Sequence, residues 1–154
     1  MDELQLPRDF SDFLRLLNSA RVEYLLVGGY AVGLHGYPRA TGDMDILVAA
    51  DPENAEKVVR VLLDFGFSPD TINQEMFEKQ RQVVRMGRPP VAIDVLTSAS
   101  GIDFSECYSR RQQRTIDGVE VSVIDLADLR TNKQASGRPK DLDDLENLPS
   151  PSDA

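Results

Sequence analysis

The chain has 154 residues, of which 41% are hydrophobic and 28% charged, the composition of an ordinary soluble globular protein. This length allows one domain with a sizeable core and makes a second independent domain unexpected. The net charge of −9 argues against non-specific coating of nucleic acid, because proteins that hold nucleic acid by its backbone usually present a basic surface.

Targeting and membrane segments are not evident in the sequence. No apolar run approaches the roughly 18 residues needed to span a membrane. The acidic start, Met1-Asp2-Glu3-Leu4, does not resemble a signal peptide. The single cysteine, Cys107, cannot form an internal disulfide, so we expect a reducing compartment and a cytoplasmic protein.

Hydrophobic periodicity and turn residues predict helices mixed with hairpin-paired strands, and hence a compact α+β domain. In chain order, the expected elements are a helix from an Asp9 cap to Ala20, a strand over 24–27, a short helix over 30–35, a strand over 43–48, a helix over 52–65, paired strands over 82–86 and 91–96, a hairpin of 114–116 with 119–124, a helix from its Asp125 cap to about 136, and a short helix containing Leu142, Leu145 and Leu148. We predict one domain over residues 1–148 and a disordered tail over 149–154.

The most informative segment is Thr41-Gly42-Asp43-Met44-Asp45-Ile46, because it places two acids on one strand. Side chains alternate along a strand, so Asp43 and Asp45 point to the same side while Met44 points into the core. Two neighbouring carboxylates repel each other unless a cation lies between them. Mg²⁺ prefers such oxygen ligands together with substrate phosphates. An exposed strand face is the alternative explanation.

A third acid, Asp94, lies in the otherwise apolar run Val91–Leu96. A carboxylate in such a strand requires a partner. Placed beside Asp43 and Asp45, it would complete a cluster able to hold two divalent ions, which can activate a hydroxyl group and stabilise a leaving pyrophosphate. A buried ion pair with an arginine such as Arg85, across the expected strand pair, is the alternative.

Gly28-Gly29 follows the first expected strand and precedes a short helix. Glycines at such a turn allow backbone N–H groups to approach a phosphate without hindrance from a Cβ atom. An ordinary tight turn is the alternative. His35, a little further on, either contacts substrate or is a hydrogen-bonded structural histidine.

Together these motifs resemble the nucleotidyltransferase (DNA polymerase β-like) superfamily. The resemblance is carried by Gly28-Gly29-Tyr30-Ala31-Val32, His35-Gly36, Arg39, Thr41 and Asp43-Met44-Asp45-Ile46. Within the superfamily, the chain is most similar to the small bacterial branch that includes AbiEii-type toxin nucleotidyltransferases, a likeness that the segment Leu129–Asp141 shares. The resemblance extends over residues 22–148.

The resemblance implies a nucleotidyltransferase fold, in which helices flank a mixed sheet. It implies that Asp43, Asp45 and Asp94 bind Mg²⁺ or Mn²⁺, and that Gly28 and Gly29 shape the pocket for a triphosphate.

The resemblance also implies that Lys133 contacts phosphate, with a surface position on its helix as the alternative. Many superfamily members have Gly-Ser at the turn, whereas Gly29 is followed by Tyr30 in this chain. Arg39 and Thr41 therefore become candidates for holding phosphate. An exposed helix start with weak surface ion pairs is expected for Lys140, Asp141 and Asp144.

The reaction that the resemblance implies is transfer of a nucleoside monophosphate from ATP or another NTP to a hydroxyl group, with release of pyrophosphate. The acceptor would be RNA, a protein or a small molecule. The likeness to toxins further implies a toxin–antitoxin or phage-defence role with a cognate antitoxin or toxin partner. The alternative is a catalytically weak binding module, such as an antitoxin-like regulator. A metal-dependent phosphohydrolase fits less well, because such sites usually recruit several histidines and His35 is the only one.

Overall fold

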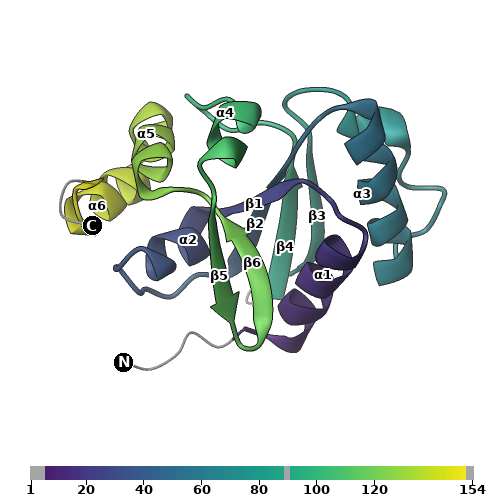
Figure 1. Ribbon diagram of the computed structural model, residues 1–154, viewed down its shortest axis with the longest axis horizontal. Helices are drawn as coiled ribbons and strands as arrows, with labels where there is room; N and C mark the ends of the chain where they lie inside the picture. Colours follow the sequence, from purple (N-terminus) through teal and green to yellow (C-terminus); the bar gives the residue numbers. More distant parts are fainter. Residues whose placement is uncertain (1–5, 89–90, 152–154) are drawn as a thin grey trace.

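The computed structural model describes residues 6–88 and 91–151, and a six-stranded mixed sheet forms its centre (Figure 1). The strand order is β3-β4-β2-β1-β6-β5. The strands are β1 (Tyr24–Val27), β2 (Asp43–Val48), β3 (Val83–Arg88), β4 (Val91–Leu96), β5 (Gln112–Ile116) and β6 (Val119–Val123). β2 and β4 are parallel, as are β1 and β6, and the other neighbouring strands are antiparallel.

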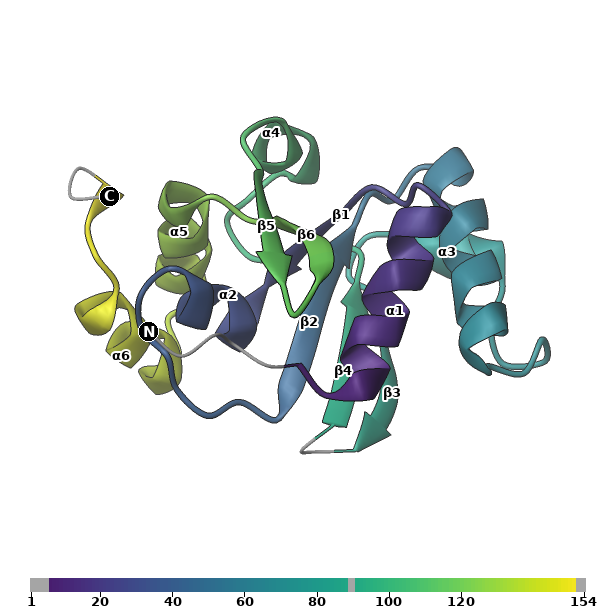
Figure 2. The ribbon, with the colours of Figure 1, turned by 60° about the horizontal axis from the view of Figure 1, so that its bottom comes forward.

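Helices flank this sheet. They are α1 (Arg8–Ser19), α2 (Gly28–Leu34), α3 (Pro52–Phe65), α4 (Phe104–Ser109), α5 (Leu126–Ser136) and α6 (Pro139–Asn147), with a 3-10 turn, η1 (Gln74–Phe77), after α3. α1 lies in front of the strands and packs beside α3 (Figure 2). α5 and α6 pack against each other on the side of the molecule opposite α3 (Figure 1).

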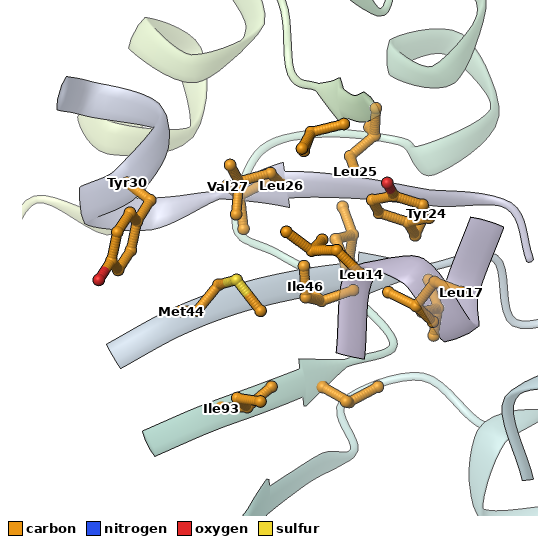
Figure 3. Packing of buried hydrophobic residues seen from close by; sticks show 14 of the residues in the cluster. Leu14, Leu17, Tyr24, Leu25, Leu26, Val27, Tyr30, Met44, Ile46 and Ile93 are labelled. Atoms are coloured by element: carbon orange, nitrogen blue, oxygen red, sulfur yellow. The ribbon is translucent and has the colours of Figure 1, made fainter. Parts of the chain in front are cut away.

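The main core lies between α1, α3 and the sheet. Phe10, Phe13, Leu14 and Leu17 recur at helical spacing on α1 and are essentially inaccessible to solvent. Leu14 and Leu17 lie beside Ile46 of β2 in Figure 3. Full burial of one such side chain contributes roughly 1.5–3 kcal/mol, so this face supplies much of the stabilisation of the sheet.

Both predicted helix caps after the first helix are confirmed. Asp51 accepts a hydrogen bond from the Asn54 backbone N–H, and Asp125 accepts one from that of Ala127. The predicted cap at Asp9 is wrong, because α1 begins at Arg8 and Pro7 occupies the cap position, two residues before the predicted cap. Pro7 already has the fixed backbone angle of a residue that enters a helix, so Asp9 falls within the first turn.

The connection predicted between the third and fourth strands is shorter than expected. β3 continues through Arg88, which pairs with Val91, and Pro89 and Pro90 lie outside the described residues. Neither η1 nor α4 was predicted. Each is too short, at 4 and 6 residues, to show a helical period in the sequence.

The predicted α+β class with a mixed sheet flanked by helices is confirmed. The prediction of one domain over 1–148 with a tail over 149–154 stays a prediction, and residues 1–5 and 152–154 lie outside the described part. None of the helices within the described ranges has the length and apolar character of a membrane span.

Candidate active site

The three predicted carboxylates lie on adjacent strands of the sheet. β2 and β4 pair in register so that Asp45 lies directly beside Asp94, and Asp43 lies two residues earlier on the same face of β2. Neighbouring positions across a sheet point to the same side. The strand register therefore brings Asp43, Asp45 and Asp94 together.

Arg85 on the edge strand β3 completes the row, because it pairs with Asp94 in the register of β3 and β4. Its guanidinium forms a bidentate pair with Asp94, with Nε 2.8 Å from Oδ1 and Nη2 2.9 Å from Oδ2. The same Nη2 lies 3.1 Å from Oδ2 of Asp43. The ion pair considered as the alternative for Asp94 is thus present, and it reaches Asp43 as well.

The local electrostatics reflect this crowding of acids. The pKa of Asp45 is raised to about 6, chiefly by burial, with further contributions from the charges of Asp94 and Asp43. Lys133 acts in the opposite direction. The carboxylates of Asp94 and Asp43 raise the pKa of Arg85 above its usual value. A cation among the acids favours their ionised form.

The chemistry of these side chains fits a divalent ion. Asp43, Asp45 and Asp94 offer carboxylate oxygens, the ligands that Mg²⁺ prefers. Oδ1 of Asp43 is buried and has no hydrogen-bond partner, so this oxygen is available as a metal ligand. Within residues 6–88 and 91–151, however, no three acidic, histidine or cysteine side chains are arranged to hold a metal ion as they stand.

The glycine turn is shaped by the acidic strand beside it. Gly28 has a φ of +69°, and a Cβ atom there would overlap the carboxylate of Asp45. A Cβ atom on Gly29 would lie 2.7 Å from Oγ1 of Thr41. Thr41 in turn donates a hydrogen bond from Oγ1 to the Asp43 carbonyl, 3.2 Å away. Gly28 and Gly29, the first two residues of α2, therefore allow the start of this helix to lie directly against Asp45 and Thr41.

These residues line one cleft of about 400 Å³, a volume typical of sites for small ligands. The acidic lining of the cleft consists of Asp43, Asp45 and Asp94 on the sheet, together with Asp141 of α6. The rest of the lining includes a larger group of basic and small polar side chains, namely Arg39, Thr41, Arg85, Ser98, Ser100, Asn132, Lys133, Ser136, Arg138 and Lys140. A phosphate-bearing ligand with bound cations would match this combination of charges.

Lys133 lies in the cleft wall, although its Nζ is held by α6. The side chain is only 5% exposed, and Nζ lies 3.0 Å from both Oδ1 of Asp141 and Oδ2 of Asp144. The alternative of a surface lysine is therefore wrong. Its predicted contact with phosphate stays a prediction, and the structure gives this lysine two carboxylate partners within the protein.

The prediction of an exposed start for α6 is confirmed for Lys140, which is exposed, and is wrong for Asp141 and Asp144. Asp141 and Asp144 are completely buried, and Leu142, which the leucine pattern placed on the helix, is half exposed. Although burial opposes it, hydrogen bonds from Arg138 and Lys133 hold the pKa of Asp141 below its usual value. Asp141 and Asp144 rather than Leu142 face α5, because Lys133 there provides a buried positive charge.

Arg39 joins the same network. Its Nε lies 2.6 Å from Oδ1 of Asp144 and its Nη2 lies 2.8 Å from Oδ2. The link fixes the loop before β2 to α6. Both Arg39 and Thr41 line the cleft, and each also has a partner within the protein. Their predicted contact with phosphate stays a prediction.

His35 has a structural role in this arrangement. Nε2 donates a hydrogen bond to the backbone carbonyl of Ile124, at 2.7 Å. Burial lowers the pKa of His35, although its hydrogen bond to Ile124 acts in the opposite direction. The histidine joins α2 to the end of β6, and of its two interpretations the structural one is supported.

Sequence reasoning missed several residues of the cleft. Arg138 and Lys140, at the start of α6, line it with exposed side chains, and Ser98, Ser100 and Asn132 contribute polar groups. Arg138 has a 70% exposed side chain despite its contact with Asp141. The single usable signal was the run Arg138-Pro139-Lys140, which places bases beside a proline helix start.

A family model for a nucleotidyltransferase of unknown function (DUF6036) matches residues 6–149. The chain belongs to this family. No curated protein matches the sequence. The family match confirms the predicted superfamily, whereas the finer likeness to AbiEii-type toxins stays a prediction.

Solved structures share the fold of this family member. A lincosamide antibiotic adenylyltransferase, LnuA, in its lincomycin-bound form is 17% identical, with a TM-score of 0.63 over 97% of this chain and 99% of that one. A Thermotoga maritima protein described as a nucleotidyltransferase (TM1012) is 15% identical, with a TM-score of 0.59 over 92% of this chain and 94% of that one. An antigenic nucleotidyltransferase-like protein from Paracoccidioides brasiliensis is 22% identical, with a TM-score of 0.52 over 89% and 72%. At these identities the likeness shows the nucleotidyltransferase fold.

Proposed function

We propose that this protein transfers a nucleoside monophosphate from an NTP to a hydroxyl group of a small molecule. The observation that carries the proposal is the convergence of Asp43, Asp45 and Asp94 in one cleft that also contains basic side chains. Membership of a nucleotidyltransferase family supports the type of reaction.

In the proposed reaction, the acceptor oxygen forms a bond to the α-phosphorus, and the bond from this phosphorus to the pyrophosphate oxygen breaks. The acceptor proton leaves to Asp94 or to solvent, and the bond electrons leave with pyrophosphate. Asp43, Asp45 and Asp94 would hold Mg²⁺ or Mn²⁺, which supplies charge neutralisation and activation of the hydroxyl group.

The other residues of the cleft would bind and orient the triphosphate. Gly28 and Gly29 present backbone beside Asp45, and Lys140 and Arg138 supply exposed positive charge. Positioning and charge stabilisation provide most of the acceleration in such reactions. The paired Arg39 and Lys133 would act mainly by fixing the walls of the cleft.

A small-molecule acceptor is favoured by two observations. The adenylyltransferase named for lincosamide antibiotics spans the same length as this chain almost completely, so a nucleotidyltransferase of this size accommodates such an acceptor. The net charge of −9 also disfavours a long contact with RNA phosphates. RNA or protein acceptors, and with them a toxin–antitoxin role, are the alternatives within the same chemistry.

A second candidate function is a nucleotidyltransferase-fold binding module with weak or no catalysis. The position of Arg85 favours it, because this arginine already forms ion pairs with Asp43 and Asp94. The two functions differ in a measurable property, since only the enzyme requires metal-dependent binding of an NTP.

The test is a transfer assay with each α-³²P-labelled NTP and Mg²⁺ or Mn²⁺. Purified protein is incubated with a cell extract separated into small-molecule, RNA and protein fractions. We expect label in the small-molecule fraction, and a loss of at least about 100-fold with Asp43→Asn. Asp117→Asn, in the exposed turn between β5 and β6, is the matched control and should retain full activity.

Label in the RNA or protein fraction would replace the small-molecule acceptor and keep the reaction type. No transfer to any fraction, combined with no metal-dependent NTP binding, would refute the enzyme and leave the binding module.

A further inference from the structure

Arg85 occupies a position that the proposed reaction requires for a divalent ion. Its guanidinium contacts both Asp94 and Asp43, at distances of 2.8–3.1 Å. These are two of the three carboxylates that the proposed function assigns to the metal. Within the described ranges, the same carboxylates do not form a ready metal group.

The strand register explains how one arginine reaches two acids on different strands. Arg85, Asp94 and Asp45 lie in one row across β3, β4 and β2. The adjacent row holds Gly87, Ala92 and Asp43. Glycine and alanine offer almost no side chain there, so the guanidinium can extend diagonally to Asp43.

The charges of the site are consistent with an exchange of cations. Three carboxylates and one guanidinium carry a formal charge of −2, and replacing the single charge of Arg85 by a divalent ion would reduce it to −1. Arg85 is 47% exposed at the sheet edge, whereas Asp94 is 11% exposed, so the arginine rather than the acid has room to move. A long side chain at an edge strand changes rotamer without any change in the sheet.

We propose that Arg85 is an internal counter-ion that holds the metal position, and that a divalent ion binds when Arg85 moves away from Asp43 and Asp94. The proposal rests on the proposed function, because it concerns the metal position of the same site. Once displaced, the guanidinium remains on the wall of the cleft, where it faces the position of a triphosphate. Arg85 is therefore a positioning residue. When a metal ion enters, its guanidinium leaves the two carboxylates and becomes one of the basic groups on the cleft wall.

The experiment measures Mn²⁺ binding directly by electron paramagnetic resonance, in the absence of nucleotide. Three proteins are compared: wild type, Arg85→Gln, and Arg88→Gln as the matched control. Arg88 lies on the same strand and is also exposed, but strand alternation directs it to the other face. We expect Arg85→Gln to bind Mn²⁺ about 10-fold more tightly than wild type and Arg88→Gln to match wild type.

Thermal unfolding separates competition from a merely structural role. Without metal, Arg85→Gln should melt below wild type, because its carboxylates are no longer neutralised. Saturating Mn²⁺ should close this gap, whereas a structural arginine would leave the same gap with and without the ion. Arg85→Lys, which keeps a positive charge but loses the bidentate contact, should give an intermediate Mn²⁺ affinity and provides a test if Arg85→Gln does not fold.

Equal or weaker Mn²⁺ binding by Arg85→Gln, or no binding by any of the proteins, would overturn the proposal. Because no nucleotide or acceptor is present, this result is independent of the transfer assay. A protein that binds Mn²⁺ more tightly after removal of Arg85 but transfers no nucleotide would support the exchange of cations and refute the proposed reaction.

Discussion

Two charged regions face the same cleft, and they differ in how their charges are compensated. At the sheet, Asp43 and Asp94 share one partly exposed arginine beside Asp45, and a buried oxygen of Asp43 lacks a hydrogen-bond partner. At the helices, the buried Asp141 and Asp144 each receive two basic partners. The acids of the first region therefore keep uncompensated charge, whereas those of the second are paired within the protein and hold the cleft walls together.

The largest expected effect comes from removing the lysine at the centre of the helical network. Lys133→Met should destabilise the protein by about 3–5 kcal/mol, because it leaves two buried carboxylates without their shared cation. Urea denaturation followed by circular dichroism measures this change. Lys57→Met, at a surface ion pair 3.9 Å long with Glu53, is the control and should cost below about 1 kcal/mol. Equal effects of the two substitutions would contradict a structural role for Lys133.

The dependence of stability on pH should differ in sign between the two regions. Contacts with Arg39 and Lys133 lower the pKa of Asp144 despite its burial, so its stabilisation is present above pH ~4 and is lost as the pH falls through the lowered pKa. Burial and the neighbouring acids raise the pKa of Asp45 to about 6. Stability from its neutral form is therefore present below pH ~4 and is lost as the pH rises through about 6.

Substitution of each acid should flatten one side of this pH profile. Below pH ~4, Asp144→Asn should reduce the slope of the unfolding free energy by up to about 1.4 kcal/mol per pH unit. Asp45→Asn should change only the slope between about pH 4 and 6. Chemical denaturation at a series of pH values, with a chelator present, measures both. The comparison fails if both variants alter the same side of the profile.

The smallest expected effect concerns an exposed base of the cleft. Lys140→Gln should raise the KM for NTP about 5-fold, equivalent to about 1 kcal/mol, and leave kcat and stability nearly unchanged. Steady-state kinetics of the transfer reaction measures the change, and Lys79→Gln, 62% exposed beside η1, serves as control. A large fall in kcat would instead place Lys140 in the chemical step.

The acidic region could be predicted from the sequence because its information is local. Asp43 and Asp45 are two residues apart on one strand, and Asp94 is conspicuous in an apolar run. Strand alternation alone aligns the first two. Their pairing with Asp94 required only that β2 and β4 be neighbours.

The helical region could not be predicted in this way. The leucine spacing of α6 suggested an apolar face, yet Leu142 is half exposed and Asp144 is buried. The burial of Asp144 depends on Arg39, which lies 105 residues earlier, and on Lys133 of α5. Charge pairing between distant elements reversed the pattern, because a buried cation favours an acid over a leucine.

The bond between Arg39 and Asp144 also has a consequence for synthesis of the chain. α6 follows the strands of the sheet in the sequence, so a growing polypeptide can form the sheet before Asp144 has been made. At that stage Arg39 and Lys133 lack the acids that hold them. The cleft is therefore finished late in translation, and a nascent chain that has not passed residue 144 carries the carboxylates of the sheet without a fixed opposite wall.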